Sequence, residues 1–101
     1  MKIVGVCSCP TGVAHTYMAA DKLTAVVKSM GYDVKVETQG MAGIEDKLTE
    51  NDLQEASLII LANEIALREP ERFEGFDDKI VKTDIHTVLH KTKEFLEENV
   101  K

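Results

Sequence analysis

The chain has 101 residues, 44% of them hydrophobic, and a formal net charge of −6 at pH 7. This length predicts one domain over residues 1–101 with a core of its own. The acidic balance and the lack of a basic cluster exclude a nucleic-acid-binding domain and argue against docking on an anionic membrane surface.

The sequence pattern also argues against a membrane-spanning protein and against a secreted one. No apolar run approaches the ~20 residues of a membrane helix, and the first residues lack the layout of a signal peptide. We therefore expect a cytoplasmic protein with no direct membrane insertion. The two cysteines, Cys7 and Cys9, are then expected to be reduced thiols. Their Cys-Ser-Cys spacing is not a zinc pattern, so we expect no metal site.

The first predicted elements are a buried strand and a helix. Residues 2–7 are apolar after Lys2, which is typical of a strand covered on both faces. From Val13 the spacing becomes helical, and Gly31 is a natural helix stop. The apolar face of this helix would hold Ala19, Ala20, Leu23, Val26, Val27 and Met30.

The second predicted strand covers residues 32–38, where apolar and polar residues alternate as on a half-exposed edge strand. Residues 39–43 are expected to form a loop. Thr49 is predicted to cap a short helix that ends near Ala56. Asp52 would complete its capping box.

The rest of the chain predicts two more strands and a helix. Residues 58–62 are fully apolar and predict a second central strand, followed by a long charged connection over 63–78. Residues 79–83 form a weaker strand with edge lysines. Asp84 would cap one last helix, with apolar positions from Ile85 to Leu96.

This order of elements predicts an α/β fold. It is a three-layer α/β/α sandwich around a four-stranded parallel sheet of order 2-1-3-4, because right-handed crossovers place the two buried strands at the centre. The strand order reverses between strands one and three, so a ligand crevice is expected at their carboxyl ends. The loop that holds Cys9 leaves strand one at this crevice.

Cys9 is the main candidate for chemistry, because it lies on a short loop between a strand and a helix N-terminus. Such a loop offers unpaired backbone N–H groups and the positive end of a helix dipole, and it activates a thiol as a nucleophile. This predicts that a phosphoryl group is taken onto sulfur and then passed on or hydrolysed. A cytosolic cysteine is more commonly a small core hydrophobe, which is the interpretation we favour for Cys7.

The residues after Cys9 would surround the bound anion. Backbone N–H groups of Thr11, Gly12, Val13 and Ala14 are expected to contact a phosphate, and Gly12 allows a backbone with positive φ. The hydroxyls of Thr11 and Thr16 could donate to the phosphate or act as ordinary caps. His15, in the first helical turn, is either a contributor to the site or an exposed helix residue.

Residues elsewhere at the crevice are accessory candidates. Gln39 and Gly40 follow the second strand at its carboxyl end, and Arg72 lies in the connection on the same side, where an arginine can contact a phosphate. His86 and His90 have a spacing that can hold a metal. No nearby ligand completes a set, so we interpret both as surface residues.

Three stretches resemble the fructose-specific enzyme IIB of bacterial phosphoenolpyruvate-dependent sugar phosphotransferase systems (PTS), and the resemblance runs along the whole chain. The first is C-P-T-G-V-A-H-T-Y-M-A-A, residues 9–20, which includes Pro10 and resembles the phosphorylation loop. The second is E-T-Q-G, residues 37–40, with G-I-E at 43–45 and L-T at 48–49. The third is Arg72-Phe73 with Gly75. Asn63-Glu64 stands where the family tends to have Ala-Asp.

The resemblance implies a phosphocarrier without a bound cofactor. Cys9 maps onto the family's phosphorylated cysteine, within a loop that covers residues 10–16. The donor would be a phosphohistidine of the IIA component, which is supplied from phosphoenolpyruvate by upstream PTS proteins. The acceptor would be fructose or a similar sugar held by the membrane IIC component. The length fits a separate B subunit.

Three alternatives remain open. Cys9 and the following residues have the length of the C-x5-R-[ST] loop of cysteine phosphatases, but His15 replaces the arginine that clamps the transition state. A thiol redox module would require both Cys7 and Cys9. A nucleotide-binding module would depend on Gly12 alone, without a G-x-G-x-x-G or Walker pattern.

Overall fold

A five-stranded sheet forms the centre of this computed structural model, which describes residues 1–9, 14–40 and 43–100. Its middle strand is β1 (Lys2–Ser8), which is buried from Ile3 onward. β1 pairs in parallel with β2 (Asp33–Gly40) on one side and β4 (Leu58–Asn63) on the other. The sequence-based prediction of two central strands is therefore confirmed.

The strand order is β3-β2-β1-β4-β5, where β5 (Ile80–Thr83) lies parallel to β4. These four parallel strands have the predicted order. The predicted loop over residues 39–43 is wrong at both ends, because β2 continues through Gly40 and β3 (Gly43–Glu45) pairs with it in an antiparallel manner. β3 makes the sheet five-stranded and mixed, whereas the sequence predicted a four-stranded parallel sheet with residues 32–38 as an edge strand. The φ of Gly43 is +100°, a backbone conformation that glycine adopts without strain.

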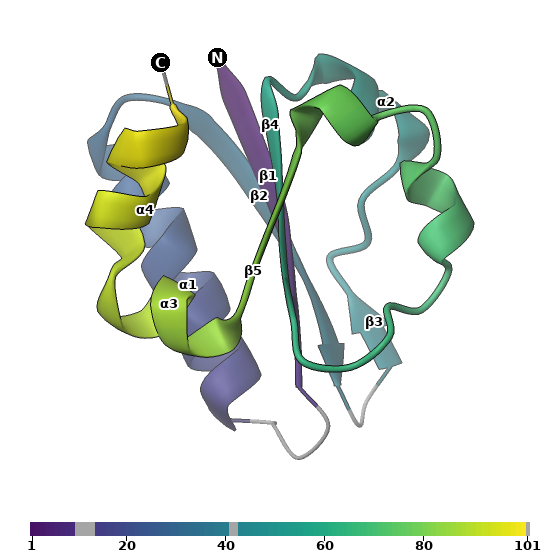
Figure 1. The fold of residues 1–101 in the computed structure, drawn as a ribbon, viewed down its shortest axis with the longest axis horizontal. Coiled ribbons are helices and arrows are strands. Elements are labelled where there is room, and N and C mark those ends of the chain that lie inside the picture. Colours follow the sequence, from purple (N-terminus) through teal and green to yellow (C-terminus); the bar gives the residue numbers. More distant parts are fainter. Residues whose placement is uncertain (10–13, 41–42, 101) are drawn as a thin grey trace.

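Helices cover both faces of the sheet and make it a three-layer sandwich (Figure 1). One face is covered by α1 (Ala14–Ser29), α3 (Ile85–His90) and α4 (Thr92–Asn99). The other face is covered by α2 (Glu50–Glu55) and by two 3-10 turns, η1 (Pro70–Phe73) and η2 (Asp77–Lys79). Within the described ranges, no helix is long and apolar enough to cross a membrane.

Local sequence signals account for three of the helix ends. Thr49 caps α2, and its side chain and that of Asp52 form the predicted capping box with each other's backbone N–H groups. Asp84 caps α3 by accepting from Thr87 N–H. Gly31 follows α1 with a φ of +85°. The caps thus place α1, α2 and α3 as the sequence predicts.

The last helical region is two helices instead of the single one predicted. Lys91 leaves the helical conformation between α3 and α4. The hydroxyl of buried Thr92 donates to the carbonyl of Val88. Thr92 lies at an apolar-face position, and Val88 and Leu96 pack in the same core cluster as residues of α1.

The carboxyl ends of β1, β2 and β4 lie at one edge of the sheet, at the bottom of Figure 1. The start of α1 lies at this edge, and the two chain termini lie at the opposite one. Ser8, the last residue of β1, pairs with Gln39 of β2 and with Asn63 of β4. The edge therefore gathers residues from three distant parts of the chain.

Candidate functional site

Cys9 lies directly after β1, at the carboxyl edge of the sheet and beside the start of α1. It is only 7% exposed and packs in the core cluster on the α1 face. Its thiol donates to Oε2 of Glu64, with 3.4 Å between sulfur and oxygen. The predicted nucleophile is thus at the sheet edge where the crevice was expected, with a carboxylate beside it.

Two buried hydroxyls lie at the end of β1 and in the first turn of α1. Ser8 ends β1 and Thr16 lies in the first turn of α1, and each is 1% exposed. Among the described residues, neither side-chain oxygen has a hydrogen-bond partner. Buried polar atoms in proteins are rarely unpaired. Each of these two hydroxyls is therefore available to a further hydrogen-bond partner.

The rest of the predicted loop is only partly described. Pro10, Thr11, Gly12 and Val13, which were predicted to surround the anion, lie outside the described residues. Ala14 begins α1, as expected for the last N–H group of that set.

His15 is exposed on α1 and is brought next to residues that sequence spacing did not connect with it. It lines a hollow together with Glu64, Ile85, His86, Leu89 and His90. The rings of His86 and His90 have centroids 4.6 Å apart. In the described part of the chain, no group of three or more histidine, cysteine or acidic residues could hold a metal ion.

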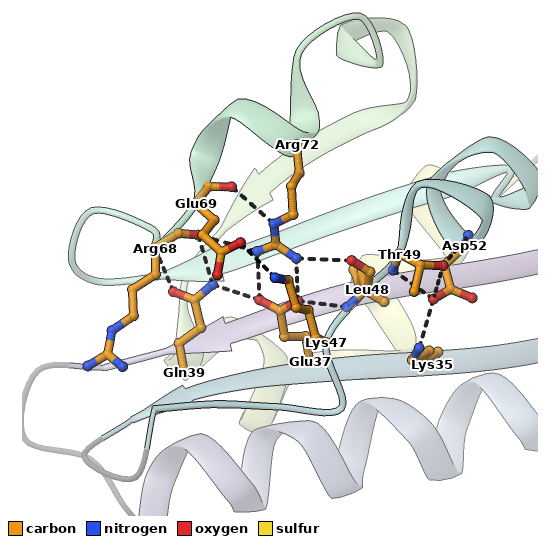
Figure 2. A network of polar contacts seen from close by, with 10 residues as sticks. All are labelled: Lys35, Glu37, Gln39, Lys47, Leu48, Thr49, Asp52, Arg68, Glu69 and Arg72. Atoms are coloured by element: carbon orange, nitrogen blue, oxygen red, sulfur yellow. Dashed lines mark hydrogen bonds and ion pairs between the residues drawn. The ribbon is translucent and has the colours of Figure 1, made fainter.

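Gln39 and Arg72, the accessory candidates, belong to a polar network around the buried carboxylate of Glu37 (Figure 2). Arg72 Nη1 and Nη2 donate to the two oxygens of Glu37 at 2.7 Å and 3.0 Å. Gln39 Nε2 donates to Glu37 Oε2 at 2.7 Å, and Leu48 N–H donates to Oε1 at 2.8 Å. Gly40 ends β2 beside this network.

The guanidinium of Arg72 is fully used. An arginine has five N–H donors, and beyond the two that bind Glu37 the other contacts go to the carbonyls of Glu69, Leu48 and Arg68. These contacts support a structural role for Arg72. A contact between Arg72 and a phosphate stays a prediction.

Burial by itself would raise the pKa of Glu37, which is 0% exposed. The hydrogen bonds from Arg72, Gln39 and the Leu48 backbone outweigh burial and hold that pKa below its ordinary value. Glu37 is therefore a buried anion with several donors. The alternating pattern of residues 32–38 had predicted it on the exposed face, because a sequence pattern cannot show a partner from a distant turn.

Cys7 packs in the interior of β1 and is 0% exposed. Burial raises the pKa of its thiol to about 12. A thiol that remains protonated at neutral pH is a poor nucleophile. The environment of Cys7 therefore supports core packing and weighs against the redox alternative.

Glu64 and Ser8 are the residues at this edge that sequence analysis did not select. The signal for Glu64 was present, since it is the second residue after the central apolar run 58–62. Its backbone N–H donates to the carbonyl of Ser8 at 3.0 Å, which fixes it beside the end of β1. Sequence spacing alone shows neither this backbone contact with Ser8 nor the contact of Glu64 with the thiol of Cys9.

Comparisons with known proteins agree with this architecture. The family model described as "PTS system, Lactose/Cellobiose specific IIB subunit" matches residues 4–98. The chain is 50% identical over 74 residues to the PTS system fructose-like EIIB component 2 of Escherichia coli K12, which covers 73% of this chain and 70% of the relative. It is 45% identical over 76 residues to the fructose-like EIIB component 1 of the same strain, covering 75% and 70%.

A solved structure is similar over almost the whole chain. It is a domain of the fructose-specific IIABC component of Borrelia burgdorferi, with a TM-score of 0.88, 42% identity and coverage of 97% of this chain and 91% of that one. Relatives of this identity and coverage share more than a fold. The chain belongs to the PTS IIB family, whose members are phosphotransferases, and within it to the fructose-like IIB components.

Proposed function

We propose that this chain is a phosphocarrier in which Cys9 takes a phosphoryl group from a phosphohistidine of the IIA component. Cys9 then passes the group to fructose or a fructose-like sugar bound by the membrane IIC component. The position of Cys9 carries the proposal: it is the one cysteine at the carboxyl edge, between the end of β1 and the start of α1. The relatives are named for a fructose-like system.

The surroundings of Cys9 suit a bound phosphoryl group. The hydroxyl of Thr16, which has no hydrogen-bond partner among the described residues, can donate to its oxygens. The first turn of α1 adds backbone N–H groups and the positive end of the helix dipole. Phosphoryl transfer depends mostly on positioning and charge stabilisation, which are the contributions that this edge can supply.

The two steps balance without a resident cofactor. In the first, an S–P bond forms on Cys9 as the P–N bond of the donor breaks, and the thiol proton ends on the departing imidazole nitrogen. In the second, a sugar hydroxyl attacks phosphorus and the S–P bond breaks. The hydroxyl proton ends on sulfur. The phosphoryl group originates from phosphoenolpyruvate through upstream PTS proteins, and both steps take place on the cytoplasmic side.

The test is mass spectrometry of the intact chain and its peptides after incubation with phosphoenolpyruvate, the general PTS proteins and a IIA component. We expect one phosphate on Cys9, its complete loss in Cys9→Ser, and its retention in Cys7→Ser, because Cys7 is buried away from the edge. Unchanged labelling of Cys9→Ser would contradict the proposal.

Two assays separate the alternatives. Turnover of an aryl phosphate that depends on Cys9, without acceptance from any IIA component, would favour the phosphatase interpretation. Reversible oxidation that requires both Cys7 and Cys9 would favour the redox interpretation.

A further inference from the structure

Among the described residues, the carboxylate of Glu64 accepts a hydrogen bond from the thiol of Cys9. The sulfur lies 3.4 Å from Oε2 of Glu64. The contact is anchored at the backbone, because Glu64 N–H donates to the carbonyl of Ser8 at 3.0 Å. Glu64 is therefore held beside the nucleophile by the pairing of β4 with β1, although its own side chain is exposed.

No cation neutralises this carboxylate among the described residues. The ion pairs of the structure join lysines and Arg72 to Asp52, Glu55, Glu69 and Glu37, and none includes Glu64. The ionisable groups that share its hollow are His15 of α1 and His86 and His90 of α3. None of them lies within ion-pair distance of Glu64.

An unneutralised negative charge at this place acts on every state of Cys9. The thiol donates a hydrogen bond to it, and negative charge that develops on the sulfur meets a like charge. The carboxylate also repels a phosphoryl group on the sulfur, because two like charges a few ångströms apart destabilise each other even when partly exposed to water. Both effects oppose the activation that the start of α1 provides.

We infer that Glu64 sets the phosphoryl-transfer potential of Cys9: it disfavours negative charge on the sulfur, so that phosphocysteine forms less completely and is discharged more readily to the acceptor. The part of this inference that concerns phosphocysteine rests on the proposed function. Glu64 changes no stoichiometry, since the S–P bond forms and breaks as above. It touches the reacting sulfur and acts through its charge.

The test compares Glu64→Gln with Glu97→Gln, an exposed residue of α4 whose substitution changes the net charge by the same amount. Both variants are made in a Cys7→Ala background, so that Cys9 is the one thiol. Glu64→Asp keeps the charge and serves as the conservative variant. The rate of Cys9 alkylation by iodoacetamide is measured across pH, without any PTS protein.

We expect Glu64→Gln to react several times faster than Glu97→Gln at neutral pH, with its pH profile displaced to lower pH, and Glu64→Asp to resemble the parent. In mixtures with phosphorylated IIA component, the equilibrium should move toward phosphocysteine by about tenfold, and discharge to the sugar should slow. An alkylation rate of Glu64→Gln that equals the Glu97→Gln rate, or falls below it, overturns the inference.

The two proposals fail separately. Faster alkylation of Glu64→Gln in a chain that accepts no phosphate would contradict the phosphocarrier function and leave the electrostatic coupling of Glu64 to Cys9 standing. Phosphate acceptance with an equilibrium that does not move in Glu64→Gln would leave the carrier in place and contradict the role of Glu64.

Discussion

Two glutamates near the carboxyl edge of the sheet have opposite environments. Glu37 is buried and accepts four hydrogen bonds from Arg72, Gln39 and the backbone of Leu48. Glu64 is exposed, has no ion-pair partner among the described residues, and accepts from the thiol of Cys9. A carboxylate whose charge is compensated stabilises the fold, whereas one whose charge is not compensated is available to act on a neighbouring reactive group.

The comparison is tested most strongly by removing the partner of Glu37. Arg72→Ala leaves a buried carboxylate without its cation, and such a change costs about 3–5 kcal/mol of unfolding free energy. Urea unfolding followed by circular dichroism measures it. Lys47→Ala, which breaks the half-exposed ion pair with Glu69, is the matched control and should cost about 0.2–1 kcal/mol.

A loss of stability in Arg72→Ala no larger than in Lys47→Ala would remove the distinction between the two glutamates. Phosphate acceptance by folded Arg72→Ala should remain near the parent level, because all five donors of Arg72 are used within the protein. A specific loss of acceptance would instead support the accessory role that the sequence predicted for Arg72.

Glu37→Gln sharpens the comparison through pH. Hydrogen bonds to a charged group contribute about 1.5–3 kcal/mol each, and the amide keeps the shape but loses the charge. The pKa of Glu37 is below its ordinary 4.5 in the folded state. Its contribution to stability is therefore complete above pH 4.5 and is lost as the pH falls through the folded-state value.

The parent should thus be more stable than Glu37→Gln at pH 7, and the difference should shrink below pH 4.5. Unfolding free energies of both proteins at several pH values measure this. A difference that does not depend on pH would mean that the charge of Glu37 contributes nothing.

The smallest effect is expected for the stability of Glu64→Gln. Glu64 is exposed, and its carboxylate forms no ion pair among the described residues. The unfolding free energy should therefore change by less than about 0.5 kcal/mol. Thermal unfolding at neutral pH is the measurement. A loss of several kcal/mol would show that Glu64 is a structural residue like Glu37, and that any change in Cys9 reactivity could follow from misfolding.

Much of this architecture follows from local pattern. The apolar runs 2–7 and 58–62, the capping box of Thr49 and Asp52 and the cap at Asp84 predicted the order of the four parallel strands and the helix starts correctly. They succeeded because periodicity and capping depend on residues close together in sequence. The antiparallel strand β3 and the break at Lys91 were missed, since neither has a strong local signal.

The sequence by itself determined that a cysteine stands at the carboxyl edge of a doubly covered parallel sheet and before a helix, because a buried strand followed by a turn and an amphipathic helix has few other arrangements. Only the tertiary structure decided which carboxylate meets it. Glu37 accepts hydrogen bonds from Arg72, thirty-five residues away, and Glu64 accepts one from Cys9, fifty-five residues away. Such pairings depend on strand register and loop paths, which no local pattern encodes.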